Sequence, residues 1–233
     1  MSEELERHSQ ALEPALVSDP DEIARIEARN GIRQTDAVTE MIEHYSHPER
    51  KFKLRPSHLL HLHRIALDGL SSYAGNWRPA GIEIKGSKHQ PVGAFLVPEE
   101  IEYMCDYVND NWDKSTPLHL AAYALWKLNW IHPFTDGNGR TARAFSYLLL
   151  CVKLGYRLSG RKTIPDQIAR DKNPYYKALE AADQQWESSK LDLTALEKLL
   201  ADLLAEQLAS VHDQATGTDN KEPPQHKGTS IRR

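Results

Sequence analysis

The amino-acid sequence predicts a mainly α-helical protein that carries one short β-hairpin. Apolar residues recur at steps of three and four over most of the chain, and prolines and glycines stand where these patterns begin and end, which is typical of amphipathic helices. Residues 81–98 differ, because β-branched residues alternate there with polar ones around Gly86 and Ser87, a pair that favours a tight turn. We therefore expect a helical core with a small β-hairpin, called the flap below.

The amino-terminal part of the chain predicts two helices. The first is expected near residues 19–29, where Pro20 suits the first turn of a helix. Gly31 is expected to end it, and a second helix follows over 36–45, where apolar residues recur at steps of four. Residues 1–50 are therefore predicted to form an amino-terminal helical extension.

The rest of the chain divides into a helical domain over 51–210 and a tail over 211–233. Helical patterns recur through the domain, at 57–70, 99–112, 117–131, 141–154 and 173–186, with a last one that starts at 191. The tail has almost no apolar residues, so it cannot form a core and is expected to be disordered. One sizeable domain is the count that 233 residues favour.

The charge and hydropathy of the chain exclude several classes of protein. A formal net charge of -4 gives no general attraction to nucleic acid or to an anionic membrane, so we expect neither as a partner. No apolar run approaches the ~18 residues of a membrane span, and the acidic, polar amino end lacks the pattern of a signal peptide. The expected location is cytoplasmic.

The cysteines and histidines do not predict a disulfide or a zinc site. Cys105 and Cys151 stand in apolar helical patterns without the spacing of metal ligands, so we expect both to be core thiols. His58, His61 and His63 follow one another at i, i+3 and i+5, which does not place all three on one helical face. No cysteine or carboxylate nearby completes a tetrahedral set.

The segment from His132 to Arg143, HPFTDGNGRTAR, contains polar residues that make little sense as packing. Gly137 and Gly139 precede a helical pattern, so the backbone can turn sharply and aim N–H groups at an anion beside the positive end of the helix dipole. Arg140 and Arg143 lie three residues apart on one face of that helix, where their guanidinium groups suit phosphate oxygens. Together these residues predict a phosphate-binding site.

Asp136 and His132 add chemistry to that site. A carboxylate immediately before a phosphate site would be repelled unless a cation stood between them, and Mg²⁺ prefers one or two carboxylates plus substrate phosphates. His132 titrates near neutral pH and is able to take a proton from an attacking hydroxyl. Each feature alone has a commoner explanation, as a tight turn, a solvated pair of arginines or a histidine at a helix end. Their conjunction in one short segment predicts a phosphoryl- or nucleotidyl-transfer site.

The same segment resembles a known family. HPFTDGNGRTAR matches the Fic-family signature HPFx(D/E)GNGRxxR at every specified position, and the resemblance extends over roughly residues 19–210. It implies an enzyme with a helical core and a β-hairpin that transfers AMP from ATP, with Mg²⁺, to a Ser, Thr or Tyr hydroxyl of a target protein. The roles that it implies are His132 as general base, Asp136 as magnesium ligand, Gly137, Asn138 and Gly139 as the phosphate-binding turn, Arg140 as the contact to the α/β-phosphate region and Arg143 as the contact to the γ-phosphate.

The resemblance also implies how the target is held and which group is transferred. The flap would bind the target segment by strand addition, through backbone hydrogen bonds from the stretch Gly86, Ser87, Lys88, His89, Gln90 and Pro91. An intact Gly139 favours AMP transfer, because relatives that use ATP as a phosphate donor carry a larger residue there. Two alternatives stay open: transfer of another phosphate-containing group, such as phosphocholine, and a nucleotide-binding or regulatory module without catalysis.

An inhibitory element of the family is only partly matched. Many Fic proteins carry (S/T)xxxE(G/N) on a helix whose glutamate pairs with the second arginine of the signature, and no glutamate of this chain is followed by Gly or Asn. The nearest candidate is Glu27, on the helix predicted near 19–29, which we expect to pair with Arg143. A separate small inhibitory protein stays open, as does a homodimer formed through the apolar stripe of residues 198–208.

Overall fold

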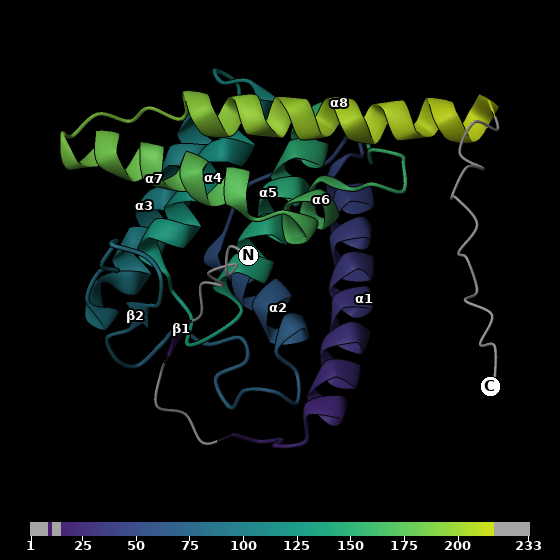
Figure 1. Ribbon diagram of the computed structural model, residues 1–233. Coiled ribbons are helices and arrows are strands. Elements are labelled where there is room, and N and C mark those ends of the chain that lie inside the picture. The colour runs from purple at the N-terminus through teal and green to yellow at the C-terminus, as the bar shows by residue number, and fades with distance from the viewer. Residues whose placement is uncertain (1–8, 11–14, 217–233) are drawn as a thin grey trace, which may run out of the picture.

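The computed structural model describes residues 9–10 and 15–216, and that part of the chain is mainly helical, as predicted. Its elements are β1 (Ser9–Gln10), α1 (Pro20–Tyr45), α2 (Pro56–Ala66), β2 (Glu83–Ile84), a 3-10 turn (Ala94–Leu96), α3 (Val97–Asp110), α4 (Pro117–Ile131), α5 (Asn138–Leu154), α6 (Ile164–Arg170), α7 (Asn173–Glu187) and α8 (Thr194–Thr216). Figure 1 shows α8 lying across one end of the molecule and α1 running along one side.

The centre of the molecule is the pair α4 and α5, which share the most extensive helix contact of the described residues. Both helices are apolar over most of their circumference, which is typical of helices that are buried on every side. The Thr116 side chain caps α4, and Gly155, with φ 82°, ends α5. The loop from 132 to 137 joins these two helices, so the most rigid part of the core holds both ends of the predicted site.

The helix α1 is continuous, and the prediction that Gly31 ends a first helix was wrong. A glycine inside a helix costs only about 1 kcal/mol relative to alanine, and contacts on either side of it outweigh that cost. Asn30 and Gln34 are buried and donate from their side chains to the carbonyls of Asp68, at 2.7 Å, and Leu62, at 3.1 Å. Tertiary hydrogen bonds to α2 and the turn after it therefore carry the helix through the glycine.

The flap differs from the predicted hairpin in its second strand. Gly86, with φ 74°, makes the expected turn, and the Ser87 N–H donates to the carbonyl of Ile84 at 3.1 Å. The arm that follows forms no strand; β2 pairs instead, antiparallel, with β1. The side chain of His89 holds this arm against another part of the chain, since its Nε2 bonds the carbonyl of Trp130 at 2.7 Å. Pro91 also lacks an N–H for a ladder.

The structure also bears on the predictions for the cysteines, the tail and membrane spans. Cys105 and Cys151 are buried free thiols, as expected, and burial raises the pKa of both. The tail predicted to begin at 211 is helical as far as Thr216, and the rest of it lies outside the described residues. Among the described helices, none combines the length and apolar character that crossing a membrane requires.

Candidate functional site

His132 ends α4 in a left-handed backbone conformation, with φ 52° and ψ 60°. This conformation costs a residue other than glycine ~1–2 kcal/mol, so contacts must hold it. The His132 N–H donates to the carbonyl of Leu128 at 2.9 Å, and its own carbonyl accepts from Arg78 Nε at 2.7 Å. The turn leaves the imidazole at the wall of a cavity.

The imidazole of His132 is arranged as a neutral base. Burial is the main cause that lowers its pKa from 6.5 to about 4; the hydrogen bond to Asn129 opposes this shift, and the positive charge of Arg78 adds to it. His132 is therefore neutral at pH 7. Its Nδ1 lies 3.3 Å from the Asn129 carbonyl, which can only accept, so Nδ1 carries the proton and Nε2 carries the lone pair.

The turn after His132 forms the amino end of α5. Gly137 caps this helix with φ 72°, and a Cβ at that position would overlap the side chain of Leu67, so only glycine fits. The side chain of Asn138 faces inward and closes the loop: it accepts from the Phe134 N–H at 2.9 Å and donates to the Phe134 carbonyl at 2.8 Å. Asn138 is thus able to offer a ligand its backbone, while its side chain fixes the shape of the turn.

The two arginines of the segment have different surroundings. Arg140 Nη1 lies 2.9 Å from Glu27 Oε1, and Arg140 Nη2 lies 3.3 Å from Asp136 Oδ2. Glu27 therefore reaches Arg140, and the expected pair of Glu27 with Arg143 is not what the structure shows. Arg143 is partly buried beside Gly139, and burial lowers its pKa from the usual value. Its guanidinium remains charged at any physiological pH.

Asp136 fits the donor chemistry expected of a magnesium ligand. Its side chain is 60% exposed and lines the cavity, which leaves carboxylate oxygen within reach of a cation. Among the described residues, no three His, Cys, Asp or Glu side chains gather as an all-protein metal cage. One carboxylate completed by phosphate oxygens and water is the arrangement that Mg²⁺ accepts with nucleotides.

His63 supports the loop from behind, a role that sequence reasoning missed. Its Nδ1 accepts from the Gly75 N–H at 3.0 Å, so Nε2 carries the proton and donates to the Asp136 carbonyl at 3.0 Å. The ring stacks on Phe134, with 3.7 Å between centroids and 8° between planes. His63 is fully buried, and its position on the inner face of α2 was the one signal in the sequence that could have identified it.

Arg78 joins the flap to the backbone of His132, and no local pattern in the sequence indicates this. Besides the bond to His132, its guanidinium donates to the carbonyl of Ala80 at 2.9 Å and to the carbonyl of Val92. Ala80 precedes the flap turn at Gly86 and Val92 follows it, so one buried side chain fixes the chain on both sides of the turn against the His132 backbone. Burial lowers the pKa of Arg78, and its hydrogen bonds to carbonyls satisfy the buried charge.

The predicted loop residues share one cavity of about 440 Å³, a size in the usual range for small-molecule sites. It is lined by His132, Asp136, Gly137, Asn138, Gly139, Arg140 and Arg143, by Glu27, and by residues of α7 that include Tyr175 and Tyr176. From the predicted flap set, Ser87 and His89 line this cavity, whereas Lys88, Gln90 and Pro91 line a second hollow on the flap. Gly86 supplies the turn.

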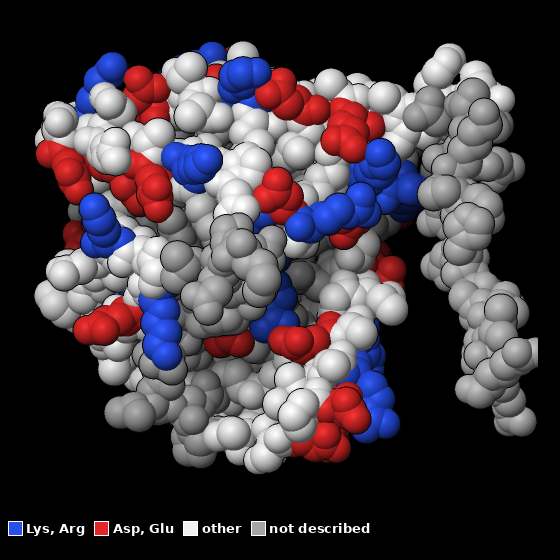
Figure 2. Space-filling view, in the orientation of Figure 1, with Lys and Arg blue, Asp and Glu red and all other residues white. Residues whose placement is uncertain are grey.

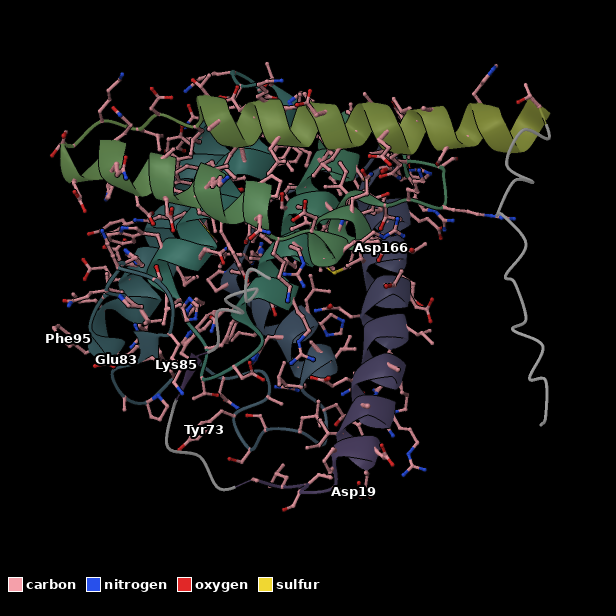
Figure 3. All side chains as sticks on the ribbon, in the orientation of Figure 1. Asp19, Tyr73, Glu83, Lys85, Phe95 and Asp166 are labelled. Carbon is pink, nitrogen blue, oxygen red and sulfur yellow. The ribbon has the colours of Figure 1, made fainter. Side chains whose placement is uncertain are left out.

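Figure 2 shows Lys and Arg interspersed with Asp and Glu on the face drawn. Figure 3 places Glu83 and Lys85 of the flap on the same side as Phe95, apart from Asp166 of α6.

Comparison with known proteins shows what this arrangement is similar to. Residues 53–150, which include the whole 132–143 segment, match the family model described as Fic/DOC family. The chain is 37% identical over 94 residues to protein adenylyltransferase fic-1 of Caenorhabditis briggsae, covering 40% of this chain and 18% of the relative. It is 31% identical over 137 residues to protein adenylyltransferase Fic of Drosophila willistoni, covering 58% and 26%. The chain thus spans about a quarter or less of the length of these relatives.

Solved structures share the fold at low identity. A Fic domain containing signaling protein from Bacteroides thetaiotaomicron aligns with a TM-score of 0.64 and 22% identity, covering 84% of this chain and 75% of that one. Fic-1 from C. elegans aligns with a TM-score of 0.60 and 23% identity, covering 81% and 52%. These structures support the fold.

Proposed function

We propose that this chain, whose residues 53–150 match the Fic/DOC family model, transfers AMP from Mg-ATP to a hydroxyl group of a target protein. The observation that carries the proposal is His132, a neutral imidazole whose lone pair lies at Nε2 in the cavity that also holds Asp136 and Arg143. A binding module without catalysis has no use for such a base. The names of the relatives, protein adenylyltransferases, support the same activity.

In the proposed reaction His132 acts as general base. A target hydroxyl attacks the α-phosphorus of ATP, Nε2 of His132 takes the hydroxyl proton, and pyrophosphate leaves. Burial keeps the imidazole unprotonated and ready to accept. The negative charge of a bound triphosphate raises the pKa of a nearby histidine, which strengthens the base when the donor is in place.

The phosphates are held by the amino end of α5. Backbone N–H groups from 137–139 offer hydrogen bonds at the positive end of the helix dipole, and the partly buried guanidinium of Arg143 adds a full charge beside them. Asp136 would hold Mg²⁺ against the phosphate oxygens, where the cation neutralises charge on the triphosphate. Arg140 would join the phosphate contacts once its bond to Glu27 is exchanged.

The target segment would be bound at the flap. Ile84 of β2 lines the cavity, and strand addition at a sheet edge would register a hydroxyl without demanding a particular sequence. Arg78 and His89 tie the flap to the backbone of Ile131, His132 and Trp130, so a strand added to β2 has a fixed relation to the base.

Glu27 is proposed as a restraint on this activity. Its carboxylate occupies Arg140, so a nucleotide must compete for that guanidinium. The side chains of Glu27 and Arg140 are 46% and 30% exposed, so the pair is partly solvated and the restraint is modest.

The experiment that tests the function is incubation of the purified protein with Mg²⁺, a cell lysate and ATP labelled at either the α- or the γ-phosphate. Label from the α-position on protein supports AMP transfer. Label from the γ-position would indicate phosphate transfer, and ATP binding without any protein label would indicate a nucleotide-binding module.

A further inference from the structure

Lys127 is a buried lysine on α4 that does not line the cavity containing His132. It is only 5% exposed, and its Nζ lies 2.9 Å from Glu100 Oε2 on α3. Burial lowers the pKa of Lys127, and the carboxylate of Glu100 opposes this shift. Replacing a buried ion pair by apolar residues of similar size often costs no stability. Stability alone therefore does not account for a lysine at this position.

Three tryptophans, called the tryptophan cluster below, surround the ammonium group of Lys127. Its Nζ lies 3.8 Å from the ring centroid of Trp130, 5.3 Å from that of Trp186 and 5.7 Å from that of Trp126. A cation within about 6 Å of the face of a tryptophan ring is attracted by it, and more strongly where water is excluded. The closest of the three contacts is to Trp130, so the ammonium holds chiefly the indole of that residue.

Trp130 links the tryptophan cluster to the flap. Its carbonyl lies 2.7 Å from Nε2 of His89, and the two rings are 5.8 Å apart between centroids. His89 lines the cavity, so its position affects how the flap faces the site. The carbonyl of the preceding residue, Asn129, lies 3.3 Å from Nδ1 of His132. Neighbouring carbonyls in the last turn of α4 therefore hold the flap and the base.

The other side of the tryptophan cluster is anchored on α7. Trp126 Nε1 donates to Asp183 Oδ1 at 2.8 Å, and the rings of Trp126 and Trp186 lie 5.4 Å apart in an edge-to-face arrangement. Lys127 thus has partners on α3, α4 and α7, and through Trp130 it reaches the flap. A single buried ammonium joins the elements that carry the flap side of the site.

We propose that Lys127 is a positioning residue for the transfer reaction, which holds Trp130 and, through it, His89 of the flap in a fixed relation to His132. The inference rests on the proposed function, because the flap is proposed to bind the target. A reacting group displaced by about 1 Å can lose about a hundredfold in rate. ATP is proposed to bind at the amino end of α5, so loss of the ammonium should affect the reaction step more than ATP binding.

The test replaces Lys127 with methionine, which keeps an unbranched side chain of similar size and removes the charge. Hydrogen exchange of the flap amides is measured by mass spectrometry, since the Ser87 N–H donates to the Ile84 carbonyl at 3.1 Å and reports opening of the turn. We expect exchange over 81–92 to become about two- to thirtyfold faster, the range to which the strength of a cation–π contact corresponds. Lys153→Met is the matched control, because Lys153 Nζ lies 5.3 Å from the ring centroid of Trp112, outside the tryptophan cluster. It should leave flap exchange unchanged.

Activity is measured in parallel, as the initial rate of label transfer from α-labelled ATP to lysate proteins against ATP concentration. For Lys127→Met we expect the maximal rate to fall by about ten- to a hundredfold, while the KM for ATP stays within about twofold of the parent. Lys127→Arg keeps a cation beside the rings and should restore both flap protection and most of the rate. If Lys127→Met does not fold, Glu100→Gln takes its place, since Glu100 is partly exposed and its loss should speed flap exchange in the same direction.

The outcomes separate the inference from the proposed function. Flap exchange and a maximal rate equal to those of the parent in Lys127→Met would overturn the inference and leave the proposed function standing. So would exchange that rises evenly over α4, α5 and the flap while the KM for ATP rises, because that pattern indicates loss of core stability. If the parent itself transfers no label from the α-phosphate, the proposed function fails, and the inference with it.

Discussion

Replacing Glu27 with glutamine tests whether this carboxylate restrains the site. The change keeps the size of the side chain and removes the charge that faces Arg140 at 2.9 Å. Because both side chains are partly exposed, the pair is worth about 0.2–1 kcal/mol, which corresponds to a change in ATP affinity of at most about fivefold. We therefore expect Glu27→Gln to lower the KM for ATP by up to about fivefold while kcat changes little.

The assay is the initial rate of adduct formation against ATP concentration, with Glu22→Gln as the matched control. Glu22 is an exposed glutamate on the same helix, and no change is expected from its replacement. The ratio of the two KM values, parent to Glu27→Gln, should approach one at high salt, since an exposed ion pair is screened. Identical kinetics for the parent and Glu27→Gln at low salt would show that Glu27 does not restrain ATP binding. A decrease in KM of more than about a hundredfold would contradict the weak ion pair between Glu27 and Arg140.

The remaining predictions concern the segment around the base. Asp136→Asn should raise the Mg²⁺ concentration needed for half-maximal activity, because the amide holds the cation less well; a Mg²⁺ titration that superimposes on the parent would refute this role. Gly137→Ala should lower the midpoint of thermal unfolding more than Gly155→Ala, because both glycines have positive φ but only the first would place a Cβ against Leu67. Equal losses would count against that packing. The value of kcat/KM should stay flat from about pH 8 to 5 and fall as pH approaches about 4, where His132 becomes protonated; an inflection near pH 6.5 would contradict its burial.

The sequence predicts the parts of the site that are local in the chain. His132, Asp136 and the glycines lie within one short segment, and a turn between two helices suffices to bring them to one cavity. The limits of α4 and α5 follow from equally local signals, namely Pro117 at the start of one and Gly155 after the other. The roles of these residues in catalysis stay predictions.

What the sequence could not predict depends on partners that are distant in the chain. Arg78 donates to carbonyls on both sides of the flap turn and to those of residues 131–132, and no local pattern indicates these contacts. Glu27 lies over a hundred positions from either arginine, so charge complementarity alone could not choose between Arg140 and Arg143. The partner of β2 is likewise set by tertiary structure, because an edge strand accepts any extended segment that reaches it.

The most direct test of AMP transfer by His132 compares the parent protein with His132→Ala. Transfer is measured with ATP labelled at the α-phosphate, and nucleotide binding is measured in parallel by calorimetry. We predict that the variant binds ATP nearly as well, because the turn at 137–139 and Arg143 remain, while transfer falls by about 10²–10⁴-fold or more. Transfer that persists in His132→Ala would contradict the role of His132 as the base. Protein label that comes from the γ-phosphate would contradict AMP transfer.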